Sequence, residues 1–316
     1  MGISKTRHRA HVAEWQEKFT NYKKKWPQFL FHHANVENAI GILKSGVLLS
    51  RNHAEANGAL VNDIAPEEII QNRDEAHAYS RLYFRPRTPT QFHIEGIRKP
   101  ANYYKGKHAG FLVMLAFNGE SVLTMSGTRF STCNMQSPHS RVLDGDADFD
   151  ELDFAGIFHD ETYPSDDEKR KRCAEVLAQS PLDAKTTLSA IVVRTDADAA
   201  TLKYLLVREG LAHLVPSVRI SHGTGVFFHD YTAVQFVDSA PSRINFKLRR
   251  PRSPGDIHTE VTATNTVTMA STLLVSQDLS PYKDYFTTHN LPDGNYRILF
   301  KLEGCYAHES VHALHS

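Results

Sequence analysis

The sequence predicts an α+β protein, and three observations support this class. Short apolar runs of strand length occur along the chain, as at residues 110–117 and 188–195. They alternate with helical stretches, but without the regular strand–helix period of a doubly wound parallel sheet. The hydrophobic fraction of 41% is ordinary for a globular protein and sufficient for a core. A length of 316 residues suits one large domain with an appendage, or two modest domains.

The first element is predicted to be an amphipathic helix over residues 8–25. Val12, Trp15 and Phe19 recur there at helical spacing, which places them on one face. Pro27 then closes the helix, because proline lacks the backbone N–H that a helix interior needs.

A short buried strand is predicted next, at residues 29–32. A helix follows over residues 36–44, and Gly46 fits the left-handed position that ends many helices. Pro66 is suited to the first turn of a further helix. The apolar residues 82–84 predict another strand, stopped by the prolines that follow.

The middle of the chain contains the clearest strand pattern, residues 110–117, which are apolar and bounded by glycines. Residues 137–168 are rich in Asp, Gly, Ser and Pro and are predicted to be mostly loop. Residues 166–178 predict a charged helix that follows or frames a strand. A buried strand at 188–195 and an amphipathic helix at 199–210 complete this part.

The composition changes after Asp238. Residues 243–256 are basic and rich in proline, which predicts a linker. Residues 257–316 carry stretches rich in Thr, Val and Tyr, which predict a small β-rich unit. We therefore expect a main domain over residues 1–245, and a linker with a β-rich C-terminal extension over residues 246–316.

Charge and cysteine content exclude several classes. The formal net charge is zero, so no global field indicates a polyanionic partner, although a local groove would suffice for one. Three widely spaced cysteines predict neither a disulfide framework nor a zinc ribbon. A polar N-terminus and the lack of a long apolar run predict a cytoplasmic protein without a membrane partner. The H-E-x-x-H pattern at 308–312 lacks a further ligand and a predicted helix, so we expect no metal.

Three stretches carry residues suited to chemistry, and each also has an ordinary structural interpretation. The first predicted strand ends at His32, and a lone histidine is more often an ordinary core or surface residue than a ligand contact. Arginines alternate with aromatics over 81–92, which suits phosphate and base contacts equally with a solvated loop. Glu175 stands in an apolar run, and a salt bridge with Arg170 or Arg172 is the alternative to catalysis.

In this order the three stretches resemble the DarT family of DNA ADP-ribosyltransferase toxins. FHHANVENAIGILKSG corresponds to the family's Y-H-I-T strand, N-L-x-x-I-L helix and glycine. IIQNRDEAHAYSRLYFRPRTP corresponds to its arginine-bearing helix and F-Y-F-x-x-R-[ST]-P-M. LDFAGIFHDETYPSDDEKRKRCAEVLA corresponds to its D-x-x-x-W segment and the basic run before Q-A-E-F-L-V. The resemblance covers roughly residues 29–210.

The resemblance implies the ADP-ribosyltransferase fold, a split mixed or antiparallel β-sandwich with flanking helices, here with the β-rich extension added. Ala34, Thr90 and Cys173 stand where the family has Thr, Met and Gln, so this chain resembles a divergent member. The choice between DNA and RNA, and the acceptor base, stay open at this point.

The resemblance also implies NAD⁺ as co-substrate and assigns catalytic roles. Glu175 would stabilise the positive charge that develops on the ribose as nicotinamide leaves, an electrostatic role strengthened by apolar surroundings. Arg73 corresponds to the family's second essential residue, and Arg51 is its rival for that position. The expected NAD⁺ contacts are His32, His33, Ala34, Arg51 and Tyr83. The expected nucleic-acid contacts are Arg85, Arg87, Thr88 and Arg129, with the loop 126–144.

The implied function is ADP-ribosylation of a nucleobase in single-stranded nucleic acid, as the toxin of a toxin–antitoxin or anti-phage defence system. The implied partners are single-stranded DNA or RNA and a cognate antitoxin, either a macrodomain hydrolase or a binding antitoxin, which we expect to dock on residues 257–316. The same chemistry on RNA or protein is one alternative, although Cys173 two residues before Glu175 argues against a protein arginine acceptor. A nucleic-acid-binding module without catalysis is the other.

Overall fold

A computed structural model describes residues 2–59, 77–135, 137–221, 225–253 and 255–315. The chain divides into two compact units, each built from several stretches of sequence. The first unit consists of Met1–His93, Val113–Val192 and Ser221–Phe227. The second unit consists of Ile94–Leu112, Val193–Ile220 and Phe228–Ser316.

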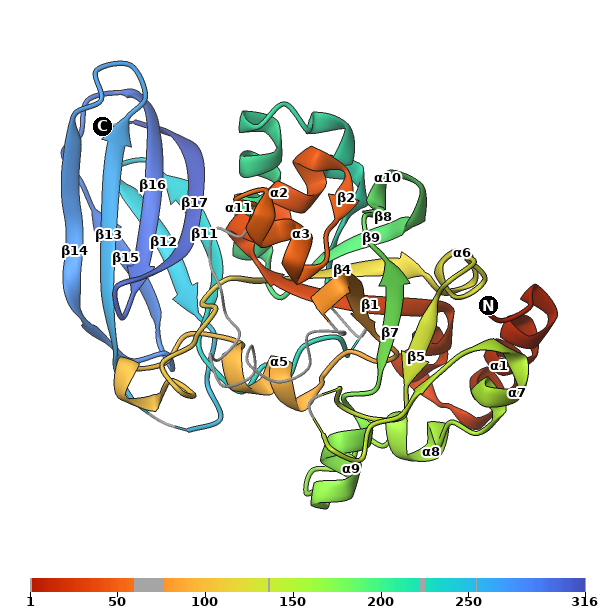
Figure 1. The fold of residues 1–316 in the computed structure, drawn as a ribbon. Coiled ribbons are helices and arrows are strands. Elements are labelled where there is room, and N and C mark those ends of the chain that lie inside the picture. Colours follow the sequence, from red (N-terminus) through yellow and green to blue (C-terminus); the bar gives the residue numbers. More distant parts are fainter. Residues whose placement is uncertain (1, 60–76, 136, 222–224, 254, 316) are drawn as a thin grey trace. The chain divides into compact units, whose positions relative to one another are not determined.

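Helices and strands are both abundant, which confirms the α+β class (Figure 1). The described α-helices are α1 Lys5–Lys18, α2 Val36–Ser45, α3 Arg51–Ala56, α5 Pro89–Ile94, α6 Gly119–Leu123, α7 Gly145–Asp150, α8 Phe154–Ile157, α9 Asp166–Lys171, α10 Ala184–Thr187 and α11 Asp196–Arg208. The described 3₁₀ helices are η1 Asn21–Gln28, η3 Pro100–Asn102 and η4 Ala212–Ser217.

The described strands form one large sheet, a three-stranded sheet, a four-stranded sheet and the short pair β2-β8. The described strands are β1 Phe29–Asn35, β2 Val47–Leu48, β3 Tyr79–Tyr83, β4 Leu112–Asn118, β5 Arg129–Ser131, β6 Val142–Leu143, β7 Glu175–Gln179, β8 Leu182–Asp183, β9 Leu188–Val193, β10 Val218–Ile220, β11 Val234–Ala240, β12 Arg243–Leu248, β13 Ile257–Asn265, β14 Ser271–Leu279, β15 Asp284–Thr288, β16 Gly294–Leu302 and β17 Cys305–Leu314.

The main sheet of the first unit is built from strands that are far apart in sequence. Its strands are hydrogen-bonded neighbours in the order β9-β4-β1-β3-β7-β5-β6, and β4 and β1 lie side by side in Figure 1. β3 and β7 run antiparallel, and so do β4 and β9. Strand β4 is buried along almost its whole length, which explains its unbroken apolar sequence.

The N-terminal helix is shorter than predicted. α1 ends at Lys18, and a separate 3₁₀ helix, η1, begins at Asn21, which has a positive φ of 55°. The buried residues of α1 are His8, His11 and Trp15, so Trp15 is confirmed, whereas the predicted Val12 and Phe19 are only half-buried. The histidine rings therefore occupy core positions, which a purely apolar pattern does not reveal.

Several predicted elements are confirmed in place. The strand predicted from residue 29 is β1, and the helix predicted at 36–44 is α2. Gly46 ends α2 with a φ of 74°, and the side chain of Lys185 packs where a Cβ would stand. The charged helix predicted over residues 166–178 is confirmed only as far as Lys171. This helix, α9, begins at a capping box formed by Ser165 and Glu168, whereas residues from Glu175 onward form strand β7, so the second half of the prediction is wrong. The helix predicted at Pro66 lies outside the described residues.

The second unit contains the predicted β-rich C-terminal region. One sheet has the order β11-β12-β15, and the other has the order β14-β13-β16-β17. Residues from both sheets share one hydrophobic core. Phe246 of β12 and Phe300 of β16 meet there edge to face, with ring centroids 5.1 Å apart.

The prediction of a linker over 243–256 is wrong in its first half. Residues 243–248 form β12, which pairs with β11 on one side and β15 on the other. Its alternation of buried and half-exposed residues identifies an ordinary strand, because the basic side chains point away from the core. The division into domains at residue 245 stays a prediction.

No α-helix among the described residues is long and apolar enough to cross a bilayer.

Candidate active site

The pairing of β3 with β7 brings Glu175 to a fixed place in the first unit. Glu175 is the first residue of β7, and it lies directly opposite Tyr83. Directly opposed residues share a face of the sheet, so the carboxylate and the phenol project to the same side. Glu175 is only 1% exposed, between the fully buried Ala174 and Val176. The apolar stretch therefore does bury the carboxylate, as its sequence indicated.

Arg81 holds this carboxylate in a bidentate ion pair. Nη2 donates to Oε1 at 2.6 Å, and Nε donates to Oε2. Arg81 lies two residues before Tyr83 on the same face of β3, and a long side chain can bridge this diagonal distance. Burial by itself lowers the pKa of Arg81, but Glu175 more than reverses this effect, so the pKa lies above its ordinary value.

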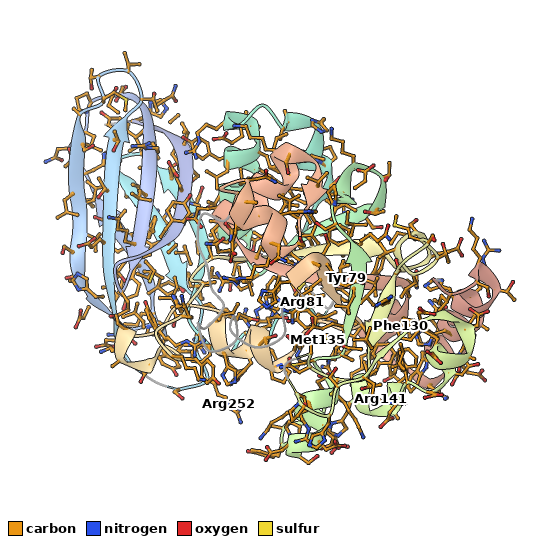
Figure 2. The ribbon with its side chains drawn as sticks, in the orientation of Figure 1. Tyr79, Arg81, Phe130, Met135, Arg141 and Arg252 are labelled. Carbon is orange, nitrogen blue, oxygen red and sulfur yellow. The ribbon has the colours of Figure 1, made fainter. Side chains whose placement is uncertain are left out.

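Two further groups approach Glu175 from other elements. The Ser131 hydroxyl at the end of β5 accepts the backbone N–H of Glu175 at 2.9 Å. The backbone N–H of Met135 lies 3.4 Å from Oε1, which is long for a hydrogen bond. Figure 2 labels Arg81 on β3, and Met135 in the segment that follows β5. A carboxylate held from two sides in this way has a defined orientation.

The predicted NAD⁺ contacts on β1 lie beside β3, the strand that carries Arg81 and Tyr83. His32 Nδ1 is 3.0 Å from the carbonyl oxygen of Arg81, so its Nδ1–H donates to that carbonyl. The ring of His33 stacks on the ring of Tyr83 with centroids 5.4 Å apart and planes inclined by 4°. Burial lowers the pKa of His32, and it lowers that of His33 to about 3, so both rings are neutral near pH 7. Ala34 is buried.

Tyr83 is therefore the meeting point of β1, β3 and β7. Burial raises its pKa, and the nearby Glu175 carboxylate raises it further. Its hydroxyl accepts from Thr90 Oγ1 at 3.4 Å. The phenol remains protonated at any pH at which the protein is handled, so the ring is available for stacking and not as a base.

The predicted second catalytic position is described only in part. Arg73 lies outside the described residues. Its rival, Arg51, is the first residue of α3 and pairs with Glu55 at 2.7 Å. The N–H of Ser50 donates to Ser180 Oγ at 2.7 Å, which ties the start of α3 to the segment after β7. The roles of both arginines stay predictions.

The predicted nucleic-acid contacts separate into exposed and buried residues. Arg129, at the start of β5, is exposed, and the Arg87 side chain is 24% exposed. Thr88 is buried, and its hydroxyl accepts the N–H of Gln91 at 3.2 Å in the first turn of α5. Arg85 is fully buried, so in this structure it meets protein groups on every side.

Arg85 is held by an acidic residue from a distant loop. Its Nη2 donates to Asp160 Oδ1 at 2.6 Å, and its guanidinium lies 4.8 Å from the centroid of Trp26. Arg87 and Lys23 reach the other oxygen of Asp160 at 3.1 and 3.3 Å. This cluster fixes the loop after β3 against the loop that precedes α9.

The alternative salt bridges considered for Glu175 are not formed by the residues expected. Arg170 pairs with Asp167 at 3.2 Å. Arg172 donates to the carbonyl of Glu161 at 2.8 Å and contacts His159 Nδ1 at 2.8 Å. The residue that sequence reasoning missed is Arg81. The alternation of Arg81 and Tyr83 along one strand is the signal that could have identified it.

The H-E-x-x-H pattern does not lie on a helix, because its residues are part of strand β17 in the second unit. His308 is buried and contacts Thr201 Oγ1 at 2.8 Å and Ser310 Oγ at 2.7 Å. The described residues contain no group of three or more His, Cys, Asp or Glu placed to hold a metal ion. The pattern is accounted for by hydrogen bonds within the second unit.

A family model described as "ssDNA thymidine ADP-ribosyltransferase, DarT" matches residues 31–228. The fold is similar to that of Thermus sp. 2.9 DarT in complex with ADP-ribosylated ssDNA. The identity is 18%, 64% of this chain and 97% of that chain are covered, and the TM-score is 0.50. It is also similar to Thermosipho africanus DarTG in complex with ADP-ribose, at 18% identity over 64% and 51% of the two chains and a TM-score of 0.51. These likenesses confirm the predicted ADP-ribosyltransferase fold. No curated protein matches the sequence.

Proposed function

Since this chain belongs to the DarT family of ssDNA thymidine ADP-ribosyltransferases, which use NAD⁺, we propose that it transfers ADP-ribose to a thymine base of single-stranded DNA. Glu175 is the proposed catalytic carboxylate. The observation that supports this assignment most directly is the burial of Glu175 at the start of β7. There it lies opposite Tyr83, whose ring stacks on His33 of β1.

The reaction requires one bond to break and one to form at the same carbon. The bond between nicotinamide and C1′ of the ribose breaks, nicotinamide leaves with the bonding electrons, and positive charge develops on the ribose. A nitrogen of the base then bonds to C1′ and loses its proton. Glu175 would accept a hydrogen bond from the 2′-hydroxyl and stabilise the positive charge, an interaction strengthened by the apolar surroundings.

The residues around Glu175 suit the neutral and aromatic parts of NAD⁺. His33 takes one face of the Tyr83 ring, so the nicotinamide would stack on the other face. The neutral histidines add no positive charge that would oppose the charge developing on the ribose as neutral nicotinamide leaves. Backbone groups of Ala34 and its neighbours would bind the carboxamide. Arg73 or Arg51 would contact NAD⁺ or take part in removing the proton from the base.

The acceptor base must be accessible on its Watson–Crick edge, because the reactive nitrogen of thymine is paired in a duplex. Arg129 and Arg87 are the proposed contacts to the strand, since both guanidinium groups reach solvent. Arg85 and Thr88 are buried, so they would not contact the strand directly but would hold the loop that carries Arg87. A direct contact between Arg85 and DNA would require the Asp160 cluster to open.

We further propose that the chain acts as a toxin, in a toxin–antitoxin or anti-phage system, in the cytoplasm. Covalent modification of template bases would block copying, and a cognate antitoxin, a macrodomain hydrolase or a binding protein, would then be required. Docking of that partner on residues 257–316 stays a prediction. Deleting them is no clean test, because β13 and β16 share a core with β12.

The acceptor is tested with labelled NAD⁺ and matched oligonucleotides. We expect label on single-stranded DNA that contains thymine, and none on the same strand with every thymine replaced by cytosine. Duplex DNA should be a poor substrate, because its bases are stacked and paired. Label on RNA or protein alone would refute the DNA proposal, and binding without label would favour the non-catalytic alternative.

Replacing Tyr83 tests the proposed stacking on nicotinamide. Tyr83→Leu removes the aromatic face, and we expect KM for NAD⁺ to rise by roughly 2- to 10-fold, in line with an aromatic contact of about 0.5–1.5 kcal/mol. Tyr83→Phe keeps the ring and should leave KM close to that of the parent. Initial rates over a range of NAD⁺ concentrations measure both variants. An equal rise in both would assign the effect to the hydroxyl and contradict stacking.

A further inference from the structure

The ion pair with Arg81 occupies both carboxylate oxygens of Glu175, which is the group proposed to bind the ribose hydroxyl. Each carboxylate oxygen accepts from one nitrogen of the guanidinium, Oε1 from Nη2 and Oε2 from Nε. A ribose hydroxyl that is to be bound by Glu175 must therefore take the place of one of these donors, or share an oxygen with it. A carboxylate oxygen can accept more than one hydrogen bond, so the pair can loosen without dissociating.

The two partners differ in how they meet solvent. The Glu175 side chain is 1% exposed, whereas that of Arg81 is 29% exposed. The carboxylate is thus enclosed by the protein, whereas part of the Arg81 side chain reaches solvent. Arg81 can turn toward solvent or a ligand while Glu175 stays in place.

We propose that Arg81 is the positioning residue of Glu175. It holds the buried carboxylate in a fixed orientation through the two-nitrogen ion pair, and it yields one oxygen to the ribose hydroxyl when NAD⁺ binds. The inference rests on the proposed function. It assigns a role to a residue that touches the catalytic group, and does not depend on a contact between Arg81 and DNA.

The charge balance around Glu175 supports this role. Among the described residues, Tyr83 on β3 and Cys173 just before β7 interact with the Glu175 carboxylate besides Arg81. Burial raises the pKa of Tyr83 and raises that of Cys173 to about 12, so both are neutral. On β1, His32 contacts the carbonyl of Arg81 and His33 stacks on Tyr83, and burial keeps both rings neutral. Of these described residues, Arg81 is the one that carries a positive charge.

The test compares Arg81→Ala with Arg81→Lys in the full chain. In Arg81→Ala the buried carboxylate loses its counter-charge, and burial then favours the protonated form. We expect kcat for transfer to fall by about 10²-fold near pH 7, and the acid limb of kcat against pH to move up by about one pH unit or more. KM for NAD⁺ should change far less. Arg81→Lys keeps the positive charge but loses the planar guanidinium that contacts the carboxylate through two nitrogens. It should therefore lower kcat less and leave the acid limb in place.

Rescue by free guanidinium separates positioning from folding. Millimolar guanidinium should restore part of kcat to Arg81→Ala, because the ion fits the space left beside Glu175, and it should not restore Glu175→Gln. Arg252→Ala is the matched control, since that arginine is 61% exposed and belongs to the second unit, whereas Arg81 and Glu175 belong to the first. Its kcat should match that of the parent with and without guanidinium.

Two results would overturn the inference. One is an Arg81→Ala variant with parental kcat at every pH, which would make the pair irrelevant to transfer. The other is a loss of kcat with an unmoved acid limb and no response to guanidinium, which would reduce Arg81 to a structural contact. Both leave the proposed function intact if Glu175→Gln is inactive. A parent chain that transfers no label at all would refute the proposed function itself.

Discussion

Replacing Glu175 with glutamine is expected to lower transfer of ADP-ribose to single-stranded DNA by about 10²–10³-fold or more. Glutamine keeps the size and shape of the side chain but carries no charge. It can still accept a hydrogen bond from a ribose hydroxyl, so binding of NAD⁺ should be largely retained. What is lost is the stabilisation of positive charge on the ribose, which acts in the transition state and so lowers kcat.

The experiment measures single-turnover transfer of label from NAD⁺ to a thymine-containing oligonucleotide. Glu14→Gln is the matched control, because Glu14 is an exposed residue of α1 that pairs with Lys18. The control should behave as the parent does. Far-ultraviolet circular dichroism and the unfolding midpoint establish that both variants are folded. Transfer by Glu175→Gln at the parental rate would remove Glu175 from the mechanism.

The largest expected effect on stability comes from Asp160→Asn. The exchange preserves shape and removes only the negative charge, which leaves the fully buried guanidinium of Arg85 without its counter-ion. Breaking a buried pair on one side typically destabilises a protein by about 3–5 kcal/mol. Arg87 and Lys23 also lose a partner, but both are partly exposed and contribute less. Urea unfolding of the parent and variant measures the difference.

The same pair predicts how stability depends on pH. Burial by itself raises the pKa of Asp160, but Arg85, Arg87 and Lys23 outweigh burial and hold that pKa below its ordinary value. A carboxyl group with a depressed folded-state pKa stabilises the protein above its unfolded pKa, about 3.9, and this contribution is lost as the pH falls through the folded pKa. The difference in unfolding free energy between parent and Asp160→Asn should therefore be constant at neutral pH and shrink below about pH 4.

Asp167→Asn serves as the control for both measurements. Asp167 pairs with Arg170 and Lys171 on the surface of α9, where its side chain is 54% exposed. Water replaces such a partner readily, so the unfolding free energy should not change measurably. An Asp160→Asn variant as stable as Asp167→Asn would show that Arg85 does not depend on its ion pair.

Local sequence was sufficient for much of the fold. The strand that starts at residue 29 and the helix that Gly46 ends are where local patterns place them. These elements depend on residues close together in the chain, on caps, glycine conformation and alternation. The helix predicted over residues 166–178 is wrong in its second half, because α9 ends at Lys171 and strand β7 begins at Glu175. The same patterns missed the half-polar strand β12, because its basic residues concealed the buried ones between them.

Sequence alone determined two features of the site: the order of the three motifs, and the single carboxylate in apolar surroundings. Tertiary structure decided the partners: Arg81 for Glu175, His33 for Tyr83 and Asp160 for Arg85. The physical reason is that these contacts join residues 50 to 94 positions apart. Strand register sets the first two, whereas the packing of two loops sets the contact between Arg85 and Asp160. The two arginines of the R-P-R segment have the same local sequence context, yet packing buries Arg85 completely and leaves Arg87 partly exposed.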